Sequence, residues 1–236
     1  MKYALILTGY MRNWDVNFPT IKKQILDRYN PDVYISSYIY SKLYWDSDKE
    51  AVDLERVLVK YNPQKYIFRE EETCPIIEFE DNNTESLGRE YSIRQLYGWY
   101  THKLALSLLD FKNYDIIIKL RPDVAISGFK IDKQNDIVIP EWKYHPGPCE
   151  ANDSYVDYIA YGTPNAIKGY FELFDKLQEM QNNNVDISLG ETLLKIYLDR
   201  YVTTDVYKDD RIDWISIGSD KWASEKGKIF PPNLVK

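Results

Sequence analysis

Short apolar runs alternate with helical periodicity along the first seventy residues. The continuous apolar run over residues 3–7 predicts a buried strand, and the strand is expected to end at Gly9. An amphipathic helix is expected to open near Pro19 and to stop at Asn30-Pro31. The pattern continues with a strand over residues 32–38, a helix over residues 54–61 and a strand over residues 66–68. This β-α-β-α-β order is typical of a parallel sheet with crossover helices.

The rest of the chain repeats these elements with longer connections. Residues 70–90, which are acidic, and residues 140–155, which contain three prolines, are expected to be loops. Around them we expect helices over residues 93–108, 167–177 and 189–197, and strands over residues 114–120, 137–139 and 156–161. We therefore predict a single α/β domain over residues 1–236, with a mainly parallel central sheet flanked by helices. Its core is placed at residues 3–200, and residues 201–236 are expected to form a C-terminal extension that packs on it, with a strand at Ile215 and Ile217 followed by a tail.

Composition and charge narrow the class of partner. The net charge is −7 and no long basic run occurs, whereas binding to duplex nucleic acid needs clustered Lys and Arg. We therefore expect no nucleic-acid partner, although a single nucleotide needs only a few local donors. The 21 Tyr and six Trp residues offer flat faces that can stack on bases or sugar rings.

Two features bear on the cellular compartment. Cys74 and Cys149 make neither a disulfide scaffold nor a metal site. The apolar run before Thr8 is too short for a signal peptide or a membrane span. We expect a cytoplasmic protein without a membrane span.

The segment after the first strand is the first candidate for ligand binding. In an open α/β sheet, ligands bind outside the carboxyl ends of the strands, where Thr8, Gly9 and Arg12 are expected. Gly9 would let the backbone approach a ligand closely, and Arg12 offers a two-pronged contact to phosphate. The alternative is a tight turn followed by a surface arginine.

The segment Lys119-Leu120-Arg121-Pro122-Asp123 ends the most apolar strand. Strand geometry places Lys119, Arg121 and Asp123 on one face, so two cations and a carboxylate converge there. A carboxylate in this position suits Mn²⁺ or Mg²⁺, which would stabilise a leaving diphosphate. The alternative is an Arg–Asp pair that only closes the strand end.

Two acidic residues are candidates for the general base. Asp157 begins an otherwise apolar strand, where Asp is disfavoured, and it would accept a proton from an acceptor hydroxyl. Glu191 falls three residues after Ser188, which is a capping-box pattern and gives Glu191 a structural reason to be present. We therefore favour Asp157 as the base of an inverting transfer and keep Glu191 in reserve. His145, in a predicted loop, is a candidate second metal ligand.

These segments, with Glu191-Thr192-Leu193-Leu194, resemble a family of small glycosyltransferases of the GT-A type over residues 3–200. Members are associated with surface-polysaccharide and lipopolysaccharide synthesis, and related forms occur in large DNA viruses. The resemblance implies a nucleotide-diphospho-sugar fold, and it implies that Asp123 does the work of the usual Asp-x-Asp metal motif. Arg121 stands where the first Asp of that motif would lie, and an arginine there would partly neutralise the diphosphate itself.

The resulting hypothesis is a glycosyltransferase that moves a sugar from a nucleoside diphosphate sugar to a hydroxyl of a glycan or glycoconjugate acceptor, assisted by Mn²⁺ or Mg²⁺. One alternative is a sugar-phosphate nucleotidyltransferase, although that class needs a Gly-rich loop and only Gly9 is present. The other is a non-catalytic module that binds glycans or nucleotides, which the abundance of Tyr would suit.

Overall fold

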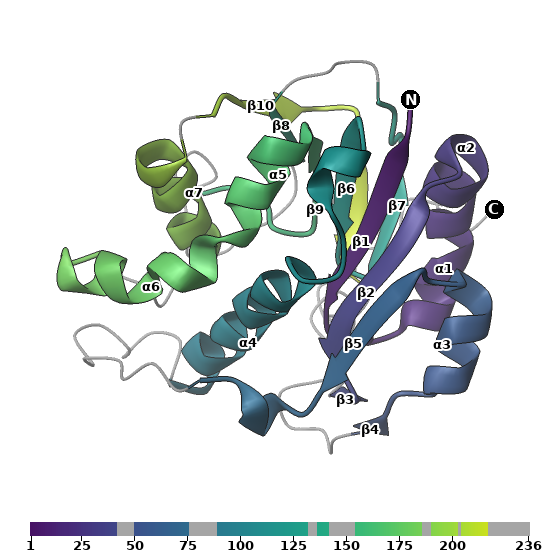
Figure 1. The fold of residues 1–236 in the computed structure, drawn as a ribbon, viewed down its shortest axis with the longest axis horizontal. Coiled ribbons are helices and arrows are strands. Elements are labelled where there is room, and N and C mark those ends of the chain that lie inside the picture. The colour runs from purple at the N-terminus through teal and green to yellow at the C-terminus, as the bar shows by residue number, and fades with distance from the viewer. Residues whose placement is uncertain are drawn as a thin grey trace, which may run out of the picture.

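The fold was analysed in a computed structural model, which describes residues 1–41, 50–75, 89–131, 136–141, 154–185, 190–202 and 204–216 (Figure 1). A seven-stranded sheet forms its centre, in the order β10-β8-β9-β6-β1-β2-β5. Its strands are β1 (Tyr3–Gly9), β2 (Asp32–Tyr38), β5 (Lys65–Arg69), β6 (Ile116–Leu120), β8 (Ile137–Pro140), β9 (Ile159–Gly162) and β10 (Val206–Asp209).

The strand directions confirm a mainly parallel sheet. β1 pairs in parallel with both β2 and β6, β2 pairs in parallel with β5, and β10 pairs in parallel with β8. Only β9 runs against its neighbours β6 and β8. The chain moves outward from β1 through β2 to β5 and then returns to β6 on the other side of β1. This reversal makes the gap between β1 and β6 a topological switch point.

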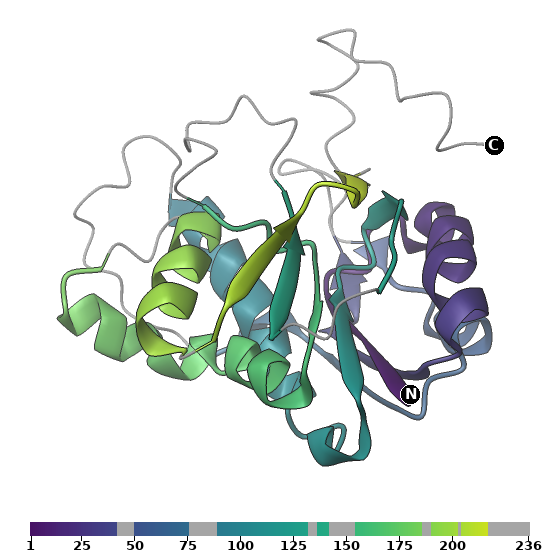
Figure 2. The same cartoon turned by 90° about the horizontal axis from the view of Figure 1, so that it is seen from above.

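Helices cover both faces of the sheet (Figures 1 and 2). One face carries α1 (Trp14–Ile21), α2 (Asp27–Tyr29) and α3 (Leu54–Tyr61), and the other carries α4 (Arg89–Ala105), α5 (Pro164–Phe171), α6 (Leu173–Asn182) and α7 (Gly190–Tyr201). The residues of β1 alternate between these faces, with Leu5 and Leu7 packed beside α1 and α3, and Ala4 and Ile6 packed beside α4 to α7. The same alternation turns Thr8 of β1 toward the face covered by α4 to α7.

The first helical segment differs from its prediction. α1 begins at Trp14 rather than near Pro19, and Pro19 lies inside the helix. Because proline has no N–H, it cannot bond the carbonyl one turn earlier. The N–H of Lys22 reaches the carbonyls of both Phe18 and Pro19, and the wider π-helical turn Lys22–Leu26 follows. The proline therefore loosens this helix without ending it.

The predicted Asn-Pro helix ends are confirmed. Asn30 and Asn62 take left-handed backbone conformations, with φ of 44° and 43°, directly after α2 and α3. Asn tolerates this conformation, and the proline that follows each one cannot continue a helix. The chain therefore leaves both helices toward β2 and β5.

Short elements account for most other differences from the predicted pattern. The helix expected over residues 167–177 is divided at Glu172 into α5 and α6. β9 begins at Ile159 rather than at residue 156, so Asp157 precedes the strand. Unpredicted antiparallel pairs are formed by β7 (Val124–Ser127) with β11 (Asp213–Ser216) and by β3 (Tyr40–Ser41) with β4 (Glu50–Ala51).

The C-terminal segment contributes directly to the sheet. β10 is an edge strand of the seven-stranded sheet and β11 pairs with β7, so the core extends beyond residue 200. Residues 217–236 of the predicted extension lie outside the described residues. Among the helices that the structure describes, none has the length and apolar character needed to cross a bilayer.

Candidate functional site

The carboxyl ends of β1 and β6 lie side by side at the switch point. Leu7 of β1 pairs with Leu120 of β6, and the last two residues of β1, Thr8 and Gly9, extend past β6 beside Arg121 while still pairing with β2. The backbone N–H of Arg121 donates to the carbonyl of Tyr158 at 2.8 Å, which adds the segment before β9 to the same edge. Three chain segments that are far apart in sequence therefore meet where α/β sheets bind ligands.

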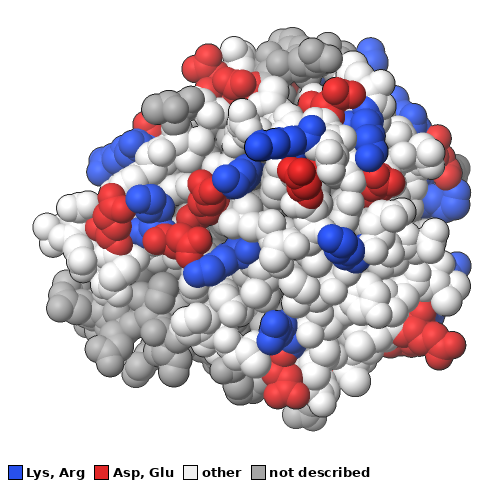
Figure 3. Space-filling model, viewed as in Figure 1, with Lys and Arg blue, Asp and Glu red and all other residues white. Residues whose placement is uncertain are grey.

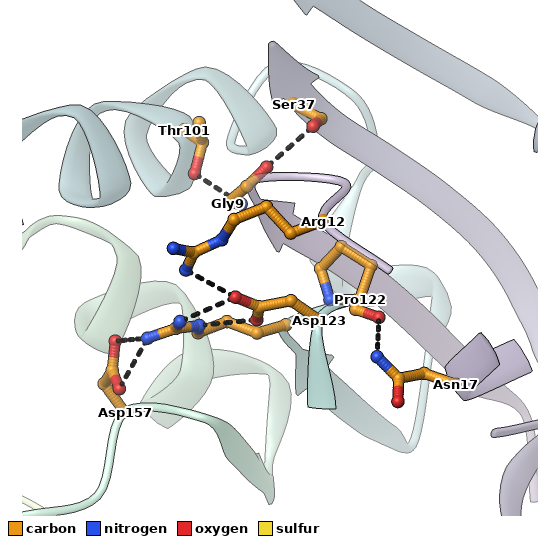
Figure 4. Close-up of polar contacts among 9 residues, drawn as sticks. Gly9, Arg12, Asn17, Ser37, Thr101, Pro122, Asp123 and Asp157 are labelled. Atoms are coloured by element: carbon orange, nitrogen blue, oxygen red, sulfur yellow. Dashed lines mark hydrogen bonds and ion pairs between the residues drawn. The ribbon is translucent and has the colours of Figure 1, made fainter. Parts of the chain in front are cut away.

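Gly9 shapes the turn that follows β1. Its φ of +96° is strained for any residue with a Cβ, although a Cβ there would meet only Arg121 Cγ at 3.7 Å. The Gly9 N–H donates to Thr101 Oγ1 at 2.9 Å, and its carbonyl accepts from Ser37 Oγ at 2.7 Å (Figure 4). Neighbouring elements thus hold this turn in place, and the turn directs Arg12 back over the sheet edge.

Asp123 lies between two guanidinium groups (Figure 4). Arg121 donates from Nε to Oδ1 at 3.0 Å and from Nη2 to Oδ2 at 2.9 Å, and Arg12 Nη2 donates to Oδ2 at 2.5 Å. Burial alone would raise the pKa of Asp123, but Arg121 and Arg12 outweigh burial and hold that pKa well below its usual range. Asp123 is therefore a buried carboxylate whose two oxygens are both engaged.

Arg121 also reaches a second carboxylate. Its Nη1 lies 3.3 Å from each oxygen of Asp157, and its Cζ lies 4.5 Å from the centre of the Tyr158 ring. Asp157 was predicted to begin a strand. In the structure it lies in the segment before β9, and the contact with Arg121 gives it a structural partner. The contacts form a continuous chain from Arg12 through Asp123 and Arg121 to Asp157.

Lys119 is buried beside this chain of ion pairs. Its side chain is fully buried, its Nζ has no hydrogen-bond partner among the described residues, and the Tyr170 ring centre lies 5.6 Å away. Burial, assisted by the charge of Arg121 and opposed by Asp157 and Asp123, lowers the pKa of Lys119 to about 7. Such a lysine lowers the stability of the fold, because its charge loses water and gains no hydrogen-bond acceptor among the described residues.

Replacing Lys119 with Met is therefore expected to raise the free energy of unfolding at pH 7 by about 1–3 kcal/mol. The pKa of Lys119 is 10.5 in the unfolded chain and about 7 in the folded protein, so the unfolded chain holds the proton more tightly. The wild-type protein should lose stability as the pH falls from 10.5 toward 7, and the variant should lose less. Urea denaturation across that range measures the difference, with exposed Lys112→Met as the matched control. An unchanged or lower stability of Lys119→Met at pH 7 would contradict the argument.

Glu191 lies in the first turn of α7, next to the segment that carries Asp157. The N–H of Tyr155 donates to the Glu191 carbonyl at 3.1 Å, which docks this segment on the start of the helix. Burial, and then the negative charge of Asp157, raise the pKa of Glu191 to about 7. The two carboxyl groups thus differ in their surroundings, since both oxygens of Asp157 face Arg121 while burial and Asp157 raise the pKa of Glu191. Ser188, the partner in the predicted capping box, lies outside the described residues.

The surroundings of Asp123 determine whether it can bind a divalent cation. Both oxygens of Asp123 accept from guanidinium groups, so a divalent cation there would displace those donors and lie against two positive charges. Within the described part of the chain, no group of three or more His, Cys, Asp or Glu side chains is arranged to hold a metal ion. His145 lies outside that part. Asp123 as described does not fit a divalent cation, and the dependence on Mn²⁺ or Mg²⁺ stays a prediction.

The structure places eight of the nine predicted site residues at this edge of the sheet: Thr8, Gly9, Arg12, Lys119, Arg121, Asp123, Asp157 and Glu191. Sequence reasoning missed Ser37 and Thr101, which hold Gly9, and Asn17, whose Nδ2 donates to the Pro122 carbonyl at 3.2 Å. The polar pair at the end of the second predicted strand was a usable signal for Ser37. Thr101 carried no signal, because its position inside a long helix does not show what it faces.

Charge on the described surface is mixed. On the face drawn in Figure 3, basic and acidic side chains are interspersed. The cations of the site are instead gathered at the sheet edge, where Arg12 and Arg121 keep 22% and 18% of their side-chain surface exposed. These partly exposed guanidinium groups are the surface that a ligand would meet.

No protein-family model matches this chain, and no protein of curated function matches it significantly. The function of the protein is therefore inferred from the geometry of its site.

Proposed function

We propose that this protein is a glycosyltransferase with a GT-A-type fold, which moves a sugar from a nucleoside diphosphate sugar to a hydroxyl of a glycan acceptor. One observation carries the proposal: two partly exposed arginines, the carboxylate of Asp157 that contacts Arg121, and the carboxyl group of Glu191 meet at the switch point of a mainly parallel sheet. Cations suit a diphosphate leaving group, and a carboxylate of raised pKa suits the removal of a proton from a hydroxyl.

The arginines are suited to binding the diphosphate. Arg12 and Arg121 are fixed on opposite sides of Asp123, so their orientation is set before a ligand arrives. The N–H groups of these guanidinium groups that lie outside the ion pairs can donate to phosphate oxygens. As the bond between the sugar and the diphosphate breaks, negative charge grows on the leaving oxygen. Donors that are already in place stabilise that charge without reorganising.

The general base is reassigned from the residue that the sequence favoured. Both oxygens of Asp157 are directed at Arg121, which commits this carboxylate to an ion pair. Glu191 has its pKa raised to about 7, which matches the requirement of a base near neutral pH. In the proposed step, the acceptor oxygen bonds to the anomeric carbon, its proton passes to Glu191, and the diphosphate leaves. Asp157 acts on Glu191 through its charge and is a positioning residue.

The function is tested by incubating the protein with UDP- and GDP-sugars and candidate glycan acceptors, in parallel with Mn²⁺ and with EDTA. Acceptor-dependent release of the nucleoside diphosphate, with the sugar recovered on the acceptor, is the expected result. Reactions without acceptor measure hydrolysis and serve as the control. Pyrophosphate release from a nucleoside triphosphate and a sugar phosphate would replace the proposal with nucleotidyl transfer. Nucleotide binding without turnover would indicate a binding module.

A further inference from the structure

We propose that Arg12 and Arg121 hold the donor diphosphate in place of a divalent cation, and that Asp123 is their positioning residue. This inference rests on the proposed function and specifies how its site recognises a diphosphate. It replaces the metal-ligand role that the sequence suggested for Asp123.

The state of Asp123 is the first argument. Its side chain is fully buried, and its oxygens accept three hydrogen bonds from two guanidinium groups. A metal ligand must direct a free oxygen lone pair toward the ion. Opening this carboxylate for a metal would leave two arginines without their common partner, which is unfavourable where burial is substantial.

The bonding of Arg12 is the second argument. Arg12 uses Nη2 for Asp123, while its Nε is buried and has no partner among the described residues. The arginine also lies over the Tyr10 ring, with Cζ 5.5 Å from the ring centre, so its plane is held from one side. An arginine that is oriented, partly exposed and not fully bonded is ready to donate hydrogen bonds to the anionic oxygens of a ligand.

The charges around Asp123 are the third argument. Two guanidinium groups flank the Asp123 carboxylate, and Asp157 balances part of the charge of Arg121 from its other side. A divalent cation placed at Asp123 would lie against both guanidinium groups, whereas the phosphate oxygens of a diphosphate would be attracted to them. Lys119, whose Nζ is buried close to Arg121 and Asp123, adds further positive charge whenever it is protonated. The position beside the two arginines therefore favours an anion over a cation.

The test measures binding of UDP and GDP by titration calorimetry in excess EDTA and again with Mn²⁺, together with binding of Mn²⁺ alone by electron paramagnetic resonance. The expected result is diphosphonucleotide binding in EDTA, changed less than about threefold in Kd by Mn²⁺, which is under 1 kcal/mol. Mn²⁺ alone should show no tight site.

Arg12→Gln keeps a hydrogen-bond donor near Asp123 but removes the charge. This variant should weaken UDP or GDP binding in EDTA about tenfold or more. The matched control is Arg56→Gln on α3, whose side chain is 55% exposed and pairs with Asp15, and it should bind as the wild-type protein does. Circular dichroism melting of each variant shows that the fold is retained.

The results separate this inference from the proposed function. Nucleotide binding that appears only with Mn²⁺, binding in EDTA that Arg12→Gln does not weaken, or no binding under either condition would overturn the inference. Sugar transfer that requires Mn²⁺ would keep the proposed function and reject this account of the diphosphate. Nucleotide binding without metal and without any sugar transfer would keep this account of diphosphate binding and reject the proposed function.

Discussion

Replacing Asp123 with Ala is expected to lower the free energy of unfolding by about 3–5 kcal/mol. The substitution removes the carboxylate that lies between Arg12 and Arg121 and contacts both. Arg12 has 22% of its side-chain surface exposed and Arg121 has 18%, so water solvates the two charges only in part. The two positive charges then repel one another at an edge of the sheet that holds three chain segments together. Urea denaturation at pH 7 measures the loss.

The pH dependence gives a second measure of the same contact. The pKa of Asp123 in the fold lies below its ordinary value of 3.8, so the carboxylate stabilises the fold fully above that value. The stabilisation is lost as the pH falls below 3.8 toward the lowered pKa. The difference between wild type and Asp123→Ala should therefore be constant from pH 7 to pH 5 and should shrink in stronger acid.

Asp175→Ala is the matched control, because Asp175 on α6 pairs with Lys103 and its side chain is 45% exposed. An exposed pair of this kind contributes about 0–1 kcal/mol, so the control should unfold almost as the wild-type protein does. A loss below about 1 kcal/mol in Asp123→Ala would mean that water already solvates the arginines. It would make Asp123 available again as a metal ligand.

The parts of the fold that followed from sequence are those with strong local signals. β1, β2 and β6 each contain a run of three or more apolar residues, and α3 ends at an Asn-Pro pair, so each was predictable from its own residues. Their β-α-β order then fixed a parallel sheet, because crossover connections leave few other topologies. The edge where the site lies followed from the same order, since carboxyl ends of parallel strands gather on one side.

The parts that did not follow depend on contacts between distant segments. β10 and β7 are four-residue strands that were not predicted, and they pair with β8 and β11. The strand around Ile215 was predicted, but its partner was not. Asp157 resembled the start of a strand because its neighbours are apolar, but the backbone pairing begins only at Ile159. Local patterns give no indication of such partners.

The site shows the same division. The sequence predicted correctly that Asp123 lies beside Arg121 at the carboxyl edge of the sheet. The alternative prediction, an Arg–Asp pair that closes the strand end, also describes part of the observed contacts. Arg12, the second arginine that contacts Asp123, is 111 positions from it in the sequence, and no local pattern around Arg12 indicates that contact. The roles of Asp157 and Glu191 were likewise undecidable from sequence, because each depends on which charge lies nearest in space.

Glu191→Gln is expected to lower kcat by about 10²–10⁴-fold while donor binding is kept, because the amide cannot take the acceptor proton. In the wild-type protein, turnover should rise with pH through about 7, where Glu191 loses its proton, and then level off. Steady-state kinetics across this range, with Glu179→Gln on α6 as the exposed control, measures both effects.

Asp157→Asn separates the two carboxyl groups. It removes a negative charge that raises the pKa of Glu191, so the rising limb of the pH profile should move to lower pH. The shift in the profile distinguishes a residue that acts through Glu191 from one that only supports the fold. If Asp157→Asn abolishes turnover while Glu191→Gln remains active, and both melt normally, the two roles are exchanged.

Stability provides the last check on Glu191. Its pKa in the fold is raised from 4.5 to about 7, so the folded state binds the proton more tightly than the unfolded chain does. The fold therefore loses stability as the pH rises from 4.5 through 7, and a neutral Gln avoids this loss. Thermal melting at pH 8 should show Glu191→Gln at least as stable as the wild-type protein. An inactive variant of undiminished stability is expected of a base that carries a proton and is not expected of a residue that mainly supports the helix.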